Sequence, residues 1–211
     1  MSAQAELRCR CGQVRGSLAN PAQRTVNRVV CYCEDCQAFA HHLGRADLLD
    51  AQGGSDIVQV APAALTFVQG QHHIAGVRLT PKGLFRWYAR CCNTPVGNML
   101  TPRIPFVGVV AQAFDKPDEL FGKPVGAILG KHAIGGAPAG SAGIRLPILL
   151  RAVSLVLGWR LRGKAWPHPF FARDTGKPIY PLSALSPEQR EALRPLCGPH
   201  PTALAHGQAS H

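Results

Sequence analysis

The 211-residue sequence predicts a mainly β protein that carries a helical extension at its C-terminus. Short alternating or β-branched runs recur up to residue 110, and Gly, Pro, Asn or Asp separates them. Clean helical patterns are scarce in that region, whereas helix-prone segments follow a glycine-rich stretch near residue 140. Because 46% of the residues are hydrophobic and only 17% are charged, most of the chain is expected to fold.

The expected strands are short and antiparallel, and two helical segments lie among them. The strands cover residues 25–30, 56–60, 65–68, 73–79, 84–88 and 106–110. A short helix is expected at residues 35–43 and a helical turn at residues 115–121. The segment 86–90, Arg-Trp-Tyr-Ala-Arg, is compatible with an anion-binding site or with a strand that exposes its arginines.

The glycine-rich segment 135–143 is expected to be a linker, so we divide the chain near residue 126. Residues 1–125 form the expected β domain, and residues 126–211 form the linker and a basic, partly helical extension. Leu146–Leu161 is helix-prone and apolar, but its arginines fall on several sides and leave no clean amphipathic stripe. A second helix is expected to begin after Ser186, which has proline next and Gln three residues on. Residues 168–171, followed by residues 174–176, predict a structured turn. The tail from Pro199 to His211 is expected to be disordered.

The formal charge is +11, and most of it lies in the C-terminal part. Residues 1–125 hold 13 Lys and Arg against 9 Asp and Glu, and residues 126–211 hold 10 against 3. The absence of a recognised nucleic-acid module argues against nucleic acid as a partner. The apolar segment Leu146–Leu161 is too short and too charged to span a bilayer. It is expected to pack on the β domain or on a twin subunit in a homo-oligomer, with contact to a membrane surface as an alternative.

Cysteine usage favours metal over disulfides. The first six residues lack a basic stretch followed by an apolar one, so no secretory signal is visible and a cytoplasmic location is expected. In that reducing compartment, clustered cysteines indicate metal binding or catalysis. Seven of the eight cysteines fall in three groups: Cys9 and Cys11; Cys31, Cys33 and Cys36; Cys91 and Cys92.

The spacing within these groups predicts two kinds of zinc site. Residues i and i+2 of a strand point to the same face, so each Cys-x-Cys pair can offer two thiolates to one ion. Cys31, Cys33 and Cys36 supply three ligands locally and leave the fourth tetrahedral position open, as in a reactive site. Cys9 and Cys11 need ligands from elsewhere, plausibly Cys92, in a closed structural site. One or two zinc ions per chain are expected.

Over residues 7–115, the order Cys-x-Cys-Gly, Cys-x-Cys-x-x-Cys-Gln, then an aromatic residue before a cysteine with Thr-Pro resembles the glutathione-dependent formaldehyde-activating enzyme family, which includes centromere protein V. The resemblance implies an all-β, tent-like fold of zinc-binding antiparallel sheets. It also implies that Cys31, Cys33 and Cys36 are catalytic zinc ligands, and that Cys9, Cys11 and Cys92 are structural ones.

The sequence departs from that family in its last motif. The family usually has Phe-Cys-x-x-Cys-Gly, but here Ala89 stands where the first of these cysteines is expected. Cys91 is the candidate replacement. Adjacent residues ordinarily point in different directions, so Cys91 and Cys92 can share one ion only in a bent turn.

The expected function is that of a carbon–sulfur lyase, acting on a small thiol such as glutathione and a small aldehyde such as formaldehyde through the three-cysteine zinc site. The alternative is a non-catalytic zinc-binding module whose basic extension contacts a partner or a membrane.

Overall fold

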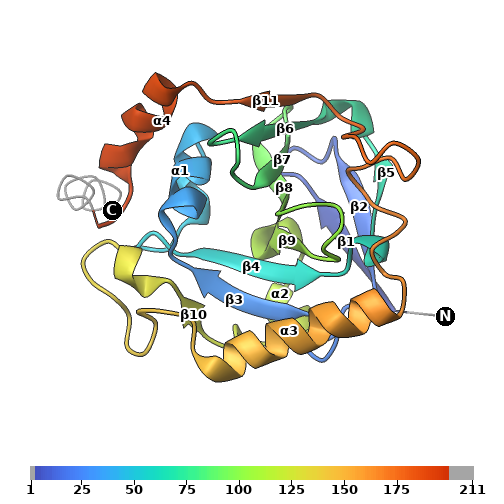
Figure 1. The fold of residues 1–211 in the computed structure, drawn as a ribbon, viewed down its shortest axis with the longest axis horizontal. Helices are drawn as coiled ribbons and strands as arrows, with labels where there is room; N and C mark the ends of the chain where they lie inside the picture. Colours follow the sequence, from blue (N-terminus) through green and yellow to red (C-terminus); the bar gives the residue numbers. More distant parts are fainter. Residues whose placement is uncertain (1–2, 200–211) are drawn as a thin grey trace.

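The computed structural model describes residues 3–199, and this part of the chain is mainly β, with eleven strands in two sheets and four α-helices (Figure 1). The strands are β1 Gln4–Arg8, β2 Arg15–Ala19, β3 Asn27–Cys31, β4 Ser55–Val60, β5 Leu65–Gln69, β6 Ile74–Arg78, β7 Phe85–Ala89, β8 Thr94–Met99, β9 Val107–Val110, β10 Ala127–Ile128 and β11 Leu182–Ala184. The α-helices are α1 Glu34–His42, α2 Pro117–Phe121, α3 Leu146–Leu161 and α4 Pro187–Leu193. The 3₁₀ helices are η1 Ala46–Leu48, η2 Pro62–Ala64, η3 Gln71–His73, η4 Ala111–Ala113, η5 Gly130–His132 and η6 Arg194–Leu196.

The smaller sheet has the order β1-β2-β5, and the larger has the order β10-β3-β4-β9-β8-β7-β6-β11. All pairs are antiparallel except those at the two edges of the larger sheet, where β10 runs parallel to β3 and β11 runs parallel to β6. Both edge strands come from the chain beyond residue 126. The division of the chain at that residue stays a prediction, but the later part completes the sheet of the earlier part.

The mainly β class is confirmed, and each of the six expected strands overlaps an observed one. The strands β1, β2 and β8 near the cysteines were not expected, and neither were the edge strands β10 and β11. In β8, Pro95 and Gly97 are turn-forming residues in most contexts, yet the strand pairs with β7 and β9. A phenylalanine ring explains Gly97, because a Cβ there would lie 2.6 Å from Phe170 Cζ.

The expected helices lie close to the observed ones. In α4, the Ser186 side chain accepts from the Gln189 amide and the Gln189 side chain accepts from the Ser186 amide, which is a capping box. Segment 135–143 contains no helix or strand, although Ser141 within it is buried. The tail expected to be disordered lies outside the described residues, except for Pro199. Within residues 3–199, no helix is long and apolar enough to cross a membrane.

The core of the larger sheet is closed by aromatic residues from the segment after α3. Phe170 is fully buried and stacks on Trp87 of β7, with ring centroids 4.9 Å apart. Phe171 meets Trp87 and Phe85 edge to face, at 5.9 Å and 5.1 Å. The predicted turn at 168–171 therefore inserts two aromatic side chains against the strand that leads to Cys91 and Cys92.

Candidate metal centres

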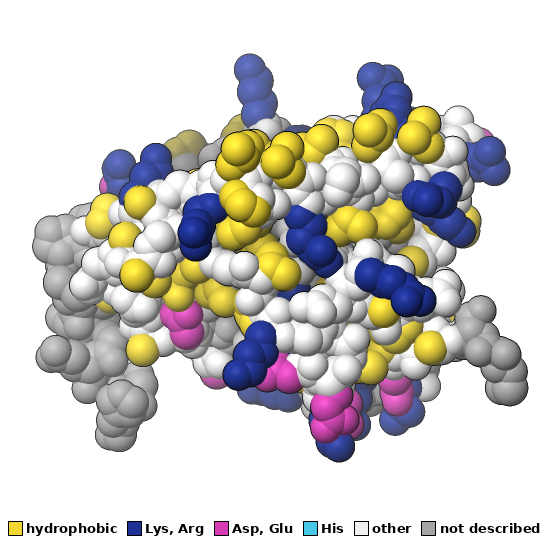
Figure 2. Space-filling view, turned by 90° about the horizontal axis from the view of Figure 1, so that it is seen from below, with side chains coloured by type: hydrophobic (Ala, Val, Ile, Leu, Met, Phe, Trp, Pro, Cys, Tyr) yellow, Lys and Arg dark blue, Asp and Glu magenta, His cyan; other side chains and the backbone are white. Residues whose placement is uncertain are grey.

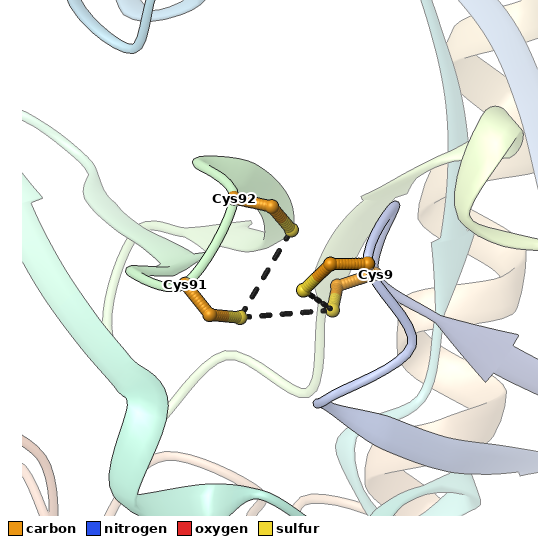
Figure 3. A group of neighbouring side chains, drawn as sticks. Cys9, Cys91 and Cys92 are labelled. Atoms are coloured by element: carbon orange, nitrogen blue, oxygen red, sulfur yellow. Dashed lines mark hydrogen bonds between the residues drawn. The ribbon is translucent and has the colours of Figure 1, made fainter.

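Four cysteines from two parts of the chain about 80 residues apart meet in one cluster, which we call the four-cysteine cluster: Cys9, Cys11, Cys91 and Cys92. Their Sγ atoms all lie within 4.8 Å of one another. Cys9 Sγ is 3.6 Å from Cys11 Sγ and 3.8 Å from Cys91 Sγ, and the Cys91 and Cys92 Sγ atoms are 4.0 Å apart. Figure 3 shows Cys91 and Cys92 on one turn with their sulfurs directed toward Cys9. Cys91 therefore lies in this cluster together with its neighbour Cys92.

The turn between β7 and β8 explains how two adjacent cysteines reach one centre. Asn93 has φ of 54°, in the left-handed region that few residues other than glycine and asparagine adopt readily. Its Nδ2 donates to the Leu43 carbonyl at 3.0 Å, and the Cys92 amide donates to the Ala89 carbonyl at 3.3 Å. The chain therefore bends sharply, as sharing of one ion by Cys91 and Cys92 requires.

Thr94 contacts the four-cysteine cluster through its side-chain hydroxyl. Its Oγ1 accepts from the Arg10 amide and from Arg45 Nη1, both at 3.0 Å, and lies 3.2 Å from Cys92 Sγ. With its lone pairs used in this way, the Thr94 hydroxyl is free to donate to the Cys92 sulfur. Burial opposes ionisation of this thiol, yet the hydrogen bonds from Thr94 and Cys11 lower the pKa of Cys92 to about 6.

The second group, which we call the three-cysteine cluster, is Cys31, Cys33 and Cys36. Cys31 ends β3, Cys33 is the N-cap of α1, and Cys36 lies in the first turn of α1. Cys33 Sγ accepts from the Cys36 amide at 3.4 Å. Their sulfurs lie within 4.8 Å of one another, and among residues 3–199 no fourth Cys, His, Asp or Glu joins them.

A buried arginine faces the three-cysteine cluster. Arg86 of β7 is 1% exposed, and its Nη1 lies 3.9 Å from Cys36 Sγ. Its Nη2 is 3.7 Å from the Asp35 carboxylate, and its guanidinium lies 5.3 Å from the centre of the Phe39 ring. Hydrogen bonds from Cys31 and Cys33, together with the charge of Arg86, hold the pKa of Cys36 well below its usual range. The arginine therefore favours thiolate at this position.

A small cavity adjoins Cys36. Phe39, Arg86 and Asn98 line it together with apolar residues of β4, β8 and β9. Its volume of about 20 Å³ is enough for a water-sized group. Arg86 Nε is buried and has no hydrogen-bond partner among the described residues.

The C-terminal extension holds the helix that carries Cys33 and Cys36, and α4 lies beside α1 in Figure 1. Arg190 of α4 donates to the Asp35 carboxylate at 2.8 Å and to Glu34 at 3.4 Å. Gln37 is fully buried and donates to the Tyr32 and His132 carbonyls, both at 2.8 Å. Its Oε1 accepts from the Gly198 amide at 2.8 Å. The position of α1 thus depends on residues far along the chain.

The family of unknown function DUF6151 matches residues 1–182. The chain belongs to this family. No curated protein matches the sequence. A crystal structure of a Rhodobacter sphaeroides protein, a structural genomics target, is similar over 58% of this chain and 98% of its own, with 15% identity and a TM-score of 0.42.

In this DUF6151 protein, the seven cysteines expected as ligands fall into two groups of the expected membership, with Cys91 in the first. The eighth, Cys197, is buried elsewhere and donates to the Leu193 carbonyl. The contacts of Asn93, Thr94 and Arg86 with the cysteine clusters and their surroundings were not expected from the sequence, although segment 86–90 was a candidate anion-binding site. Converging thiols at these distances suit a soft-ligand metal such as zinc. The donor sets therefore fit the expected ion.

Proposed function

We propose that this protein binds two zinc ions, one in each cysteine cluster, and joins a small thiol to a small aldehyde at the three-cysteine cluster. The observation that carries the proposal is the difference between the clusters. Four cysteines converge in one, which makes a closed structural site, and three converge in the other, beside a cavity and a buried cation.

A buried cation offsets part of the negative charge of the three-cysteine cluster. Three thiolates and one Zn²⁺ sum to −1, and Arg86 supplies +1 at 3.9 Å from Cys36 Sγ. Zinc bound there would supply a Lewis acid with an open position that can accept an external thiol sulfur and lower its pKa. Asp35 and Phe39 hold the guanidinium of Arg86 in place.

The reaction forms one carbon–sulfur bond. The thiol sulfur attacks the carbonyl carbon of the aldehyde, the π electrons move to the oxygen, and the thiol proton ends on that oxygen. The product is a thiohemiacetal such as S-hydroxymethylglutathione. Arg86 lines the cavity, and its guanidinium is a donor group suited to the oxygen as its charge develops.

The test is a glutathione titration of zinc-loaded, reduced protein by calorimetry, repeated with Cys33→Ser and Cys11→Ser. Cys33→Ser is expected to abolish binding while keeping most of the fold. The matched control, Cys11→Ser, is expected to keep binding and to lower the unfolding temperature, because Cys11 belongs to the cluster that ties β1 to the β7–β8 turn. The reverse pattern would show that the two roles are exchanged.

The non-catalytic zinc module remains the alternative function, and the exposed apolar face of α3 favours it as a way to contact a partner. The same titration separates the two functions. A zinc-loaded protein without any affinity for glutathione or formaldehyde would favour the module.

A further inference from the structure

The longest helix presents an apolar stripe to solvent. The exposed fractions of its side chains are Leu146 64%, Leu149 44%, Leu150 58%, Val153 53%, Leu157 53% and Leu161 78%. At 100° per residue these six positions cover about 120° of the helix surface. Exposed apolar residues are normal singly, but a continuous row of six on one helix indicates an interaction site.

The helix is anchored through its other side. Ile148 and Trp159 are buried against the body of the protein. Arg151 Nη2 donates to the Val26 carbonyl at 2.9 Å and also to the Gln23 carbonyl. The orientation of α3 is thus fixed, with the apolar stripe facing away from the core.

The part of the chain that contains the stripe is basic and has no acidic residues. From residue 120 to residue 173 the chain has eight Lys and Arg and no Asp or Glu. Arg145 immediately precedes α3, Arg160 lies within the arc of the stripe at its C-terminal end, and Arg162 and Lys164 follow the helix. Figure 2, seen from the side on which α3 lies in Figure 1, shows hydrophobic side chains with Lys and Arg side chains between and around them.

We propose that this stripe docks on an anionic phospholipid bilayer, with α3 lying in the plane of the interface. Apolar side chains of such a helix enter the boundary of the acyl chains, and flanking Lys and Arg contact lipid phosphates. At 16 residues, α3 is too short to span the bilayer, which agrees with a helix that lies on the surface.

Charge favours a bilayer over a second copy of the chain. A two-fold contact through α3 would bring two sets of arginines together, and segment 120–173 offers no carboxylate to pair with them. An anionic lipid surface supplies the missing negative charge. This proposal does not depend on the cysteine clusters or on the proposed chemistry.

The test is co-sedimentation of the full, reduced chain with two kinds of vesicle, phosphatidylcholine alone and phosphatidylcholine mixed with phosphatidylglycerol. Binding is expected to the mixed vesicles and to weaken as salt rises. The double variant Leu150→Glu, Leu157→Glu should lower the partition coefficient at least about tenfold, since it removes two leucines from the inserted face and adds negative charge.

The matched control is Val68→Glu, Ile179→Glu, which makes the same charge change at exposed apolar residues outside α3. It is expected to bind mixed vesicles as the parent does. Failure of the parent chain to bind these vesicles, or equal loss in both double variants, would overturn the proposal. So would a dimer in solution that only the α3 variant dissociates, because that result would assign the stripe to a second copy.

Discussion

Arg86 Nη1 lies 3.9 Å from Cys36 Sγ, which joins a buried strand residue to the first turn of α1. We predict that Arg86→Met weakens zinc binding at the three-cysteine cluster about 10- to 100-fold, the range for loss of a group that supports metal ligands. The physical reason is that three thiolates then carry an uncompensated charge in a buried setting. Competition with a chromogenic chelator measures the change.

The control for Arg86→Met is Arg90→Met, on an exposed arginine just beyond the same strand. Arg90→Met should bind both zinc ions with the affinity of the parent chain. If Arg86→Met holds both ions with parental affinity, the role assigned to the Arg86 charge is wrong.

Asn93 permits the bent turn that brings Cys91 and Cys92 together. We predict that Asn93→Ala lowers the free energy of unfolding by about 1–2 kcal/mol, because alanine is strained at a φ of 54°. Asn93→Gly should lower the free energy of unfolding by less. Glycine adopts this backbone conformation readily, so the variant loses only the hydrogen bond to the Leu43 carbonyl. Denaturant melts of the zinc-loaded chains compare the two. Equal losses would attribute the effect to the side chain alone.

Phe170 connects the C-terminal part to the sheet. We predict that Phe170→Ala lowers the free energy of unfolding by about 3–5 kcal/mol, because it leaves a cavity against Trp87. Ile179→Ala, at a half-exposed position of the same segment, should lower the free energy of unfolding much less.

A chain that ends at residue 125 is also expected to unfold more readily than the full chain, since it lacks Phe170 and the other residues that pack on the sheet from the C-terminal part. A fragment as stable as the full chain would support an independent domain at 1–125.

His168 gives the stability a specific pH dependence. Burial lowers the pKa of His168 to about 4, and its Nδ1 accepts from the Phe170 amide at 3.1 Å. The unfolded chain binds this proton more readily, so the neutral imidazole contributes stability above pH 6.5 that is lost as the pH falls toward 4. The total loss is at most about 3 kcal/mol.

His168→Asn tests this contribution, because its Oδ1 is an acceptor that does not titrate. Subtracting the pH profile of the variant from that of the parent removes the acid sensitivity that both share through their cysteines. The free energy of unfolding of the parent minus that of the variant should rise as the pH increases from 4 to 6.5. A flat difference would contradict the pKa assigned to His168.

The sequence predicted the parts of the fold that depend on local patterns. The capping box after Ser186 and the range Leu146–Leu161 needed only neighbouring residues, and both are observed. Pro95 and Gly97 concealed β8, because the partner that makes glycine necessary, Phe170, comes from more than 70 residues later. The apolar stripe of α3 was missed because the arginines were weighed without knowing which side faces the core.

In the candidate site, too, the sequence predicted the local groupings and not the long-range contacts. Spacing alone grouped Cys31, Cys33 and Cys36, which lie on one strand end and one helix turn. Placing Cys91 with Cys9 required the geometry of the turn at Asn93. The pairing of Arg86 with Cys36 spans 50 residues, and no local pattern indicates it.

The most direct test is the ratio of zinc to protein in the reduced full chain, measured by elemental analysis after purification with zinc and removal of loosely bound metal. The account predicts two zinc ions per chain, and one in Cys33→Ser, where the four-cysteine cluster stays intact. A chain that is folded and reduced but holds no zinc, or one whose zinc content is unchanged by Cys33→Ser, would contradict it.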